Sequence, residues 1–565
     1  MRGATARSRQ IGGERFCVRT VWLAGVAYGA YLLVPPAAAF PTTDPSNASL
    51  MTAGSDLGSA AASDTSDATA LAHQMQLLGP FGATVGPGWT FTPSLTLQEA
   101  LNDNVFETQS NRSWDLISYL TPGLIVTANT QDVQLRLNYQ PTLEYYARNT
   151  SQNQLAQNLN AIGNVTLWQD HLYLDVRAAA GVGSTSGSMP GLGYGTTSSG
   201  QPNSGITGLT KQNSTQYTSF AVSPYFLQQF DTYGTLKLGY TLSHTTTSNA
   251  GGFVPLPTNS TGTSASQTTN EEFAQFTSGT FLERATDTVA IDATQYQGTG
   301  AATSGYNETA TNTVNYVVNR EIAVFGSFGY ENINYGGTDP LVITGPTWQI
   351  GATLTPNPKS TLTMSYGRQQ GEDSLTVNGV YQATTRTSIN ISYGQQLGTE
   401  LQSLENQLAS GNLNNPGINP RTGQPFTNGN NLLGIPTGLY RSETMTAGTS
   451  TLLNRDTFTF NVQYAKYTAA GAGATGSTNG FTGTANWNHA IRDYLMLNVS
   501  ASYGQRWFTD PGGANTFAAA TASLQYLISA TVSTTLSYAF YDLNSTQQGQ
   551  SFYQDILLLS LTKQF

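Results

Sequence analysis

The sequence predicts an all-β protein: a transmembrane antiparallel up-and-down β-barrel of about 22 strands, within a range of 16 to 22. Three observations indicate this fold. Charged residues make up only 10% of the 565-residue chain, against roughly 25% in typical soluble domains. Segments of alternating apolar and polar residues follow one another from Trp89 to the last residue. Short turns and long connections alternate between these segments.

The alternation is clearest in the segment that begins at Val133, where odd positions are mostly apolar and even positions mostly polar. Segments beginning at Phe458 and Leu495 repeat the pattern. A period of two places the two sets on opposite faces of a sheet. A soluble β-sandwich would alternate in the same way, so the direction of the apolar face has to come from the connections.

Every second connection is short and polar, whereas the others are longer and rich in Gly, Ser, Asn and Pro, above all 183–214, 247–268 and 397–437. This asymmetry is typical of short periplasmic turns and long extracellular loops, and it places both ends of the barrel on the periplasmic side. The predicted short turns are Gln131–Asp132, Gln169–Asp170, Phe230–Asp231, Arg284–Thr286, Asn319–Glu321, Asn357–Lys359, Thr385–Arg386, Asn454–Asp456, Ile491–Asp493 and Ser529–Ala530.

Residues 1–39 have the three regions of a secretory signal peptide: five arginines, an apolar run over 21–34, and alanines before a cleavage site. An uncleaved N-terminal anchor is the alternative. Residues 40–86 are rich in Ser, Ala, Thr, Asp and Gly, which predicts a flexible low-complexity periplasmic linker. Residues 87–565 then form the outer-membrane β-barrel.

Composition also argues against several function classes. The only cysteine, Cys17, lies in the leader, so disulfides and thiolate sites are excluded from the mature chain. Without the leader, 18 basic and 32 acidic residues remain, and such a charge repels nucleic acid. The histidines, at 73, 171, 244 and 489, are scattered without ligand or catalytic spacing. We therefore predict no enzyme activity, no metal and no cofactor.

Five charged residues near the start of the barrel lie on faces opposite apolar ones and are predicted to line the lumen: Arg136, Glu144, Arg148, Asp175 and Arg177. On the lipid face, Arg or Lys would cost about 2–4 kcal/mol near the midplane. Inside the barrel, these charges either brace the wall or form a selectivity lining.

The stretch Leu397 to Ala409 has leucines at spacings of four and three within the longest connection. This spacing predicts a helix. It either folds inward and constricts the pore or caps the barrel from outside.

The last segment places Leu557, Leu559, Leu561 and Phe565 on one face. A terminal Phe after alternating apolar residues resembles the signal recognised by the bacterial barrel-assembly machinery. Lys563 departs from that pattern, although its stem can stay in lipid while the ammonium reaches the interface. The expected partners are this machinery, outer-membrane lipid and lipopolysaccharide.

The barrel begins with Pro93-Ser94, continues through Asp103-Asn104 and has Thr121-Pro122-Gly123 in its second segment. This start, over roughly residues 89 to 180, resembles the outer-membrane barrels associated with PEP-CTERM and exopolysaccharide systems. The resemblance implies a role at the cell surface near polysaccharide or sorted-protein export. By their own chemistry, Asp103 and Asn104 favour a turn, and the prolines suit strand ends or bulges.

These observations favour a non-enzymatic outer-membrane barrel that lets a polar solute or polymer pass, plausibly exopolysaccharide. A TonB-dependent-type transporter is the alternative, because about 22 strands is the size of such plugged barrels. Against it, residues 40–86 are too short and too polar for a globular plug. A third hypothesis is a structural or adhesive surface barrel sealed by its own loops and lumen charges.

Overall fold

The computed structural model describes residues 83–84, 88–184, 214–249, 265–299, 302–337, 340–409, 438–509, 512–547 and 549–565. The predicted signal peptide, 1–39, lies outside the described residues. Of the predicted linker, 40–86, only β1 (Ala83–Thr84) is described, and it pairs with the first barrel strand. Within the described part of the chain, no helix is long and apolar enough to cross a membrane.

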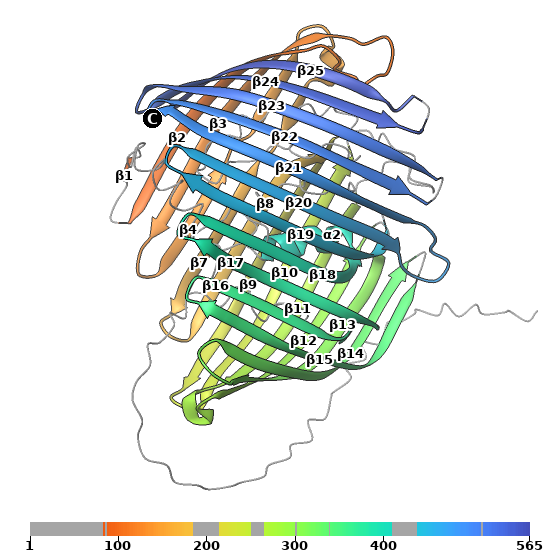
Figure 1. Cartoon of the computed structure of the whole chain (residues 1–565). Helices are drawn as coiled ribbons and strands as arrows, with labels where there is room; N and C mark the ends of the chain where they lie inside the picture. Colours follow the sequence, from red (N-terminus) through yellow and green to blue (C-terminus); the bar gives the residue numbers. More distant parts are fainter. Residues whose placement is uncertain are drawn as a thin grey trace, which may run out of the picture. The chain divides into compact units, whose positions relative to one another are not determined.

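The wall is a closed antiparallel barrel of 22 strands (Figure 1), which confirms the predicted fold class. Two of its strands are interrupted: β4 (Val133–Tyr139) continues as β5 (Thr142–Tyr146), and β6 (Gln154–Ala156) continues as β7 (Leu159–Trp168). The others are β2 (Trp89–Asn102), β3 (Asp115–Asn129), β8 (Leu172–Ser184), β9 (Ser214–Phe230), β10 (Gly234–Asn249), β11 (Ala265–Ser278), β12 (Ala285–Gly298), β13 (Ala302–Val317), β14 (Ile322–Gly337), β15 (Leu341–Asn357), β16 (Ser360–Gln369), β17 (Glu372–Thr384), β18 (Thr387–Thr399), β19 (Leu439–Leu453), β20 (Asp456–Ala469), β21 (Ser477–Arg492), β22 (Leu495–Phe508), β23 (Gly513–Ser529), β24 (Val532–Ser545) and β25 (Phe552–Gln564).

The barrel closes where the first strand meets the last. β2 pairs with β25 from Ser94↔Gln564 to Asn102↔Ile556. Beyond the last pair, the backbone N–H of Phe565 donates to the carbonyl of Pro93 at 2.9 Å. Closure leaves no open sheet edge, and lipid could not satisfy the N–H and C=O groups of such an edge.

All ten predicted short turns join consecutive strands at the end of the barrel where both β2 begins and β25 ends. Asp170, Asp231 and Asn454 adopt positive φ in three of these turns, a conformation that Asp and Asn tolerate better than most residues. The three predicted long connections fall between β8 and β9, between β10 and β11, and between β18 and β19, and they lie largely outside the described residues.

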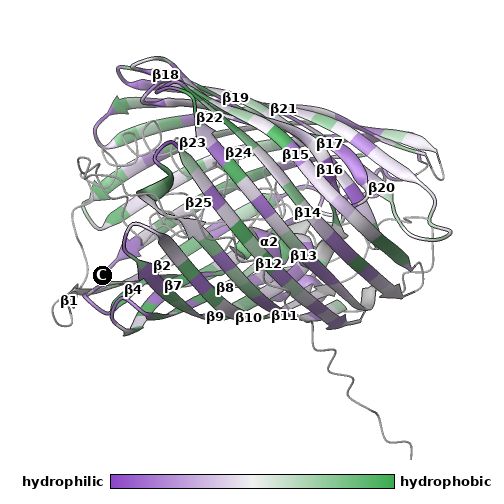
Figure 2. Ribbon diagram, turned by 90° about the horizontal axis from the view of Figure 1, so that it is seen from below, coloured by the Kyte–Doolittle hydropathy of each residue, from purple (hydrophilic) through white to green (hydrophobic). Residues whose placement is uncertain are grey.

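Side chains alternate between the two faces of the wall, and Figure 2 shows the alternating hydropathy along the strands. Outward apolar side chains are exposed, as for Phe328 (69%) and Ile350 (62%). Inward positions are mostly Ser, Thr, Asn and Gln, and many are buried, including Ser219, Ser223 and Thr245. The apolar face therefore points away from the barrel interior, which decides against a soluble sandwich.

We expect Ile350→Arg to lower the free energy of unfolding by about 2–4 kcal/mol, because it places a cation on the lipid face. Urea unfolding in lipid vesicles measures this loss. The matched control is Gln349→Arg, on the inward face of the same strand, where the loss should be clearly smaller. Equal losses for the two variants would contradict the assignment of the faces.

Candidate functional site: the lumen and its inward-folded helix

A single described α-helix, α2 (Glu400–Ala409), follows directly on β18. It packs against β8, β9, β10, β11 and β18, and it lies within the ring of strands in Figure 2. Of the two positions predicted for the helical stretch, the inward one is confirmed. The predicted start at Leu397 is three residues early, because β18 continues to Thr399.

The helix begins with a capping box formed by Thr399 and Gln402. The hydroxyl of Thr399 accepts from the backbone N–H of Gln402 at 3.3 Å, and Gln402 Oε1 accepts from the backbone N–H of Thr399 at 2.9 Å. This reciprocal pair satisfies two donors at the helix start. The hydroxyl of Tyr335 on β14 donates to Gln402 Oε1 at 3.3 Å, so the cap is also tied to the wall.

Three leucines of α2, Leu401, Leu404 and Leu408, are buried. The strand end that leads into the helix is buried too, since Leu397 belongs to an apolar cluster with Tyr296, Ile333, Tyr335 and Leu439. Inward positions of the wall are mostly polar, so this cluster is a local apolar surface at the start of the helix.

Arg177 on β8 holds the C-terminal end of α2. Its Nη1 donates to the carbonyl of Leu408 at 3.3 Å, and its Nε forms an ion pair with Asp175 Oδ1 at 2.6 Å. A cation at a helix C-terminus interacts favourably with the helix dipole and with the unpaired carbonyls there. The Arg177 side chain is 5% exposed and that of Asp175 13%, so neither charge is well screened by solvent.

Glu405 is the polar anchor in the middle of the helix. Ser243 on β10 donates to its Oε1, and on β11 Thr269 donates to its Oε2 at 2.9 Å and Gln267 at 3.4 Å. Burial raises the pKa of Glu405 to about 7, against the opposing effect of the bonds from Thr269 and Gln267.

Further charges lie on the wall around the helix. Glu271 on β11 and Asp292 on β12 interact with each other at close range, and Glu405 acts electrostatically on Glu271. The ammonium of Lys237 on β10 lies 4.7 Å from the ring centroid of Tyr225 and 5.4 Å from that of Phe273. This part of the lumen therefore presents charges of both signs.

The predicted lumen residues fall into three groups. Asp175 and Arg177 lie at the helix. Glu144 is buried on the inner face of β5 and accepts from Gln154 Nε2 at 2.9 Å, and Arg136 is half-buried on β4. Arg148 lies two residues beyond the end of β5 at Tyr146, where alternation no longer assigns a face, and its exposed guanidinium lies 4.3 Å from the ring centroid of Trp114.

Sequence reasoning missed Glu405, Ser243, Thr269, Lys237 and the Glu271–Asp292 pair as parts of this site. An acidic residue between leucines of a helical stretch was a usable signal for Glu405. The wall partners carried no such signal, because Ser, Thr and Gln occur throughout the inward rows.

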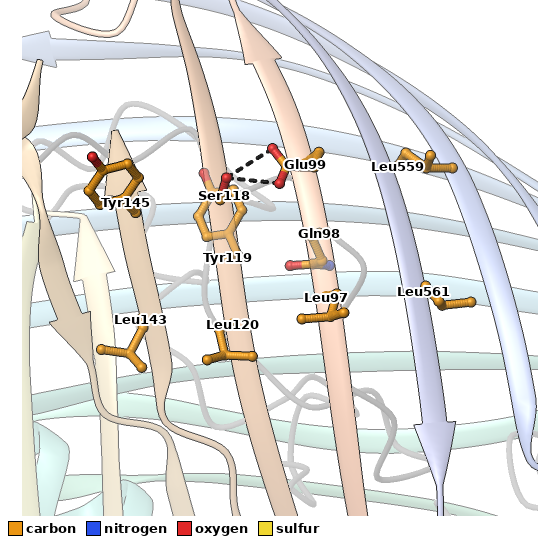
Figure 3. A pocket seen from close by; sticks show the side chains of 10 residues that line it. All are labelled: Leu97, Gln98, Glu99, Ser118, Tyr119, Leu120, Leu143, Tyr145, Leu559 and Leu561. Atoms are coloured by element: carbon orange, nitrogen blue, oxygen red, sulfur yellow. Dashed lines mark hydrogen bonds between the residues drawn. The ribbon is translucent and has the colours of Figure 1, made fainter. Parts of the chain in front are cut away.

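The predicted C-terminal row lies on the outer face beside the closure. Leu557, Leu559, Leu561 and Phe565 are all exposed. Leu559 and Leu561 also line a groove of about 510 Å³ together with further leucines. The groove contains one carboxylate, Glu99, which accepts a hydrogen bond from the hydroxyl of Ser118 (Figure 3).

The motif residues at the barrel start act structurally at this closure. Asn104 is fully buried and donates to the carbonyls of Thr108 and Tyr553, so the predicted turn residue also binds the last strand. Gly123 pairs with Ser94. A Cβ at Gly123 would lie 2.2 Å from Ser94 Oγ, so a larger residue there would force the Ser94 hydroxyl to move.

Arg177→Gln should lower the free energy of unfolding by up to about 3–5 kcal/mol, because it breaks the ion pair with Asp175 and the bond to the Leu408 carbonyl. Urea unfolding in vesicles provides the measurement. Arg136→Gln removes the same charge from β4, which is not among the strands that α2 chiefly packs against, and should cost less. A loss for Arg177→Gln no larger than for this control would show that the pair does not brace the wall.

Phe565→Ala should reduce the yield of folded barrel in the outer membrane several-fold while the exported chain accumulates in the periplasm. Fractionation and heat-modifiable gel mobility give both quantities. Gln564→Ala, at the neighbouring position, is the control and should leave the yield near normal. Normal assembly of Phe565→Ala would refute a role for the C-terminal residue in recognition by the assembly machinery.

Comparison with known proteins gives a match for the closing part of the barrel. Residues 452–565 match the family described as "Putative beta-barrel porin 2". This segment contains β20 to β25. No curated protein matches the chain.

Several solved structures have a similar fold. The FrpB iron transporter from Neisseria meningitidis (F5-1 variant) has a TM-score of 0.47 and 10% identity, over 87% of this chain and 84% of that one. The siderophore receptor PirA from Acinetobacter baumannii has a TM-score of 0.46 and 10% identity, over 84% and 80%. The ferric-catecholate import receptor Fiu from E. coli K12, in its open form, has a TM-score of 0.45 and 12% identity, over 84% and 81%.

The closed wall and its outward apolar face, together with the match of its closing strands to that family, identify an outer-membrane β-barrel.

Proposed function

We propose that this protein is a non-enzymatic conduit for a polar solute or polymer, and that α2 narrows its lumen. The observation that carries the proposal is the docked helix. It is capped by Thr399 and Gln402, bonded through Glu405 to two wall strands, and held at its C-terminus by Arg177. A segment fixed inside a barrel in this way reduces the open cross-section.

Exopolysaccharide or another surface polymer is the cargo that we propose. The resemblance of the barrel start to barrels of exopolysaccharide systems supports this cargo. The chemistry of the inward face supports it as well, because hydroxyl pairs such as Ser219–Thr245 and Ser223–Thr241 face the interior. Sugars are recognised by hydroxyl and amide hydrogen bonds together with aromatic rings.

A receptor-type transporter is the second candidate, favoured by one observation: barrels of 22 strands include the plugged outer-membrane transporters. Such a transporter would show high-affinity binding of one ligand and no passive conductance. A sealed structural or adhesive barrel would show neither property.

Single-channel conductance of the full mature protein in planar bilayers tests the conduit. We expect stable steps from the intact protein and larger steps after residues 400–437 are replaced by a Gly-Ser turn between β18 and β19, since the lumen is then wider. Silence from both proteins, with insertion verified by heat-modifiable mobility, would refute an open conduit. Block by an acidic or a neutral polysaccharide then tests the cargo class.

A further inference from the structure

The position of Glu405 makes the docked state of α2 sensitive to protons. Its half-buried carboxyl group lies between the helix and the wall, where Ser243, Thr269 and Gln267 contact it. Hydroxyl groups donate and accept, so Ser243 and Thr269 suit both the neutral and the ionised acid. Only the ionised form carries the free-energy penalty of removing a charge from water.

Further acidic groups lie on the wall near Glu405. Glu271 on β11 and Asp292 on β12 lie next to each other, and Glu271 interacts electrostatically with Glu405. The wall also presents the phenols of Tyr296 on β12 and Tyr335 on β14. Like charges at short range repel, so Glu271, Asp292 and Glu405 do not readily carry full negative charge together.

The two cations in this region, Arg177 and Lys237, contact groups other than the Glu405 carboxyl. The guanidinium of Arg177 bonds to Asp175 and to the Leu408 carbonyl, and the ammonium of Lys237 lies over the rings of Tyr225 and Phe273. Both cations act on Asp175, and Lys237 also acts on Glu271. The described partners of the Glu405 carboxyl group are Ser243, Thr269 and Gln267, and none of them is a cation. Glu405 therefore docks most favourably as a neutral acid.

We propose that α2 is a proton-controlled latch: the helix closes on the lumen wall when Glu405 is protonated and is released as Glu405 ionises. The latch rests on the proposed conduit only for its effect on passage, because docking itself is a property of the helix and the wall.

The direction follows from the two states of the carboxyl group. Docking raises the pKa of Glu405 by burial from its ordinary 4.5 to about 7. The contribution of Glu405 to docking is fully present below pH 4.5. Between the two pKa values the equilibrium constant for docking falls roughly tenfold per pH unit, and above the upper value this contribution is lost. The helix is thus most firmly closed in acid and loosest above neutral pH.

Labelling of a buried cysteine measures release without reference to conductance. The full-length protein carries Cys17→Ser and Leu404→Cys, since Leu404 is 6% exposed in the docked helix. A membrane-impermeant maleimide is applied to the folded barrel in vesicles from pH 5 to pH 8. The same reporter in a Glu405→Gln background supplies the reference rate at each pH, which cancels the intrinsic pH dependence of the thiol.

We expect the rate relative to this reference to rise roughly tenfold per pH unit between pH 5 and pH 7 and then to level off. Glu272→Gln, on the outward face of β11, is the matched control and should retain the rise. Leu401→Cys, also buried in α2, is the second reporter if Leu404→Cys does not fold. A ratio that stays constant with pH would overturn the latch.

Conductance at the same pH values separates the two proposals. Labelling that rises with pH in a silent barrel would leave the latch in place and refute the conduit. Conductance with a constant labelling ratio would support the conduit and refute the latch. Parallel increases in labelling and conductance, both abolished by Glu405→Gln, would support the two together.

Discussion

Closure of the sheet between β2 and β25 is the constraint on which the rest of the structure depends. In lipid, each backbone N–H and C=O group needs a partner within the protein. The first and last strands therefore have to pair, although more than 450 residues separate side chains that bond across this junction, such as Thr96 and Thr562 at 3.0 Å. Asn104 and Gln554 add further bonds there. With the ring closed, every strand has one face toward lipid and one toward the interior.

A closed ring of this size encloses more space than the wall's own side chains fill. The helix α2 occupies part of this space. Its start lies at an apolar cluster of the wall, and Glu405 and Arg177 form polar contacts between the helix and the wall. Helix and wall are thus complementary in both kinds of contact. That complementarity makes an obstruction by this segment compatible with an otherwise polar interior.

Charged groups in this interior occur in two different settings. Asp175 and Arg177 are bonded to each other and to the helix end, as a bracing role requires. Glu405 with Glu271 and Asp292 concentrates acidic groups where a helix has to dock. The contacts of Asp175 and Arg177 favour the bracing alternative for these two lumen charges, whereas the latch that we propose depends on Glu405.

The sequence by itself determined the fold class, the strand number, the ten short turns and the helix near residue 400, because each follows from local periodicity or turn chemistry. The side on which α2 packs depended on tertiary structure, since Ser243 and Thr269 lie more than 130 residues away from Glu405 in the chain. Arg148 shows the same limit: alternation assigns a face only while a strand continues, and β5 ends two residues earlier. Local sequence sets the direction of a side chain along a strand. Which distant side chains it contacts is decided only in the closed barrel. The contacts between α2 and the wall join segments that are far apart in the chain and share no local pattern.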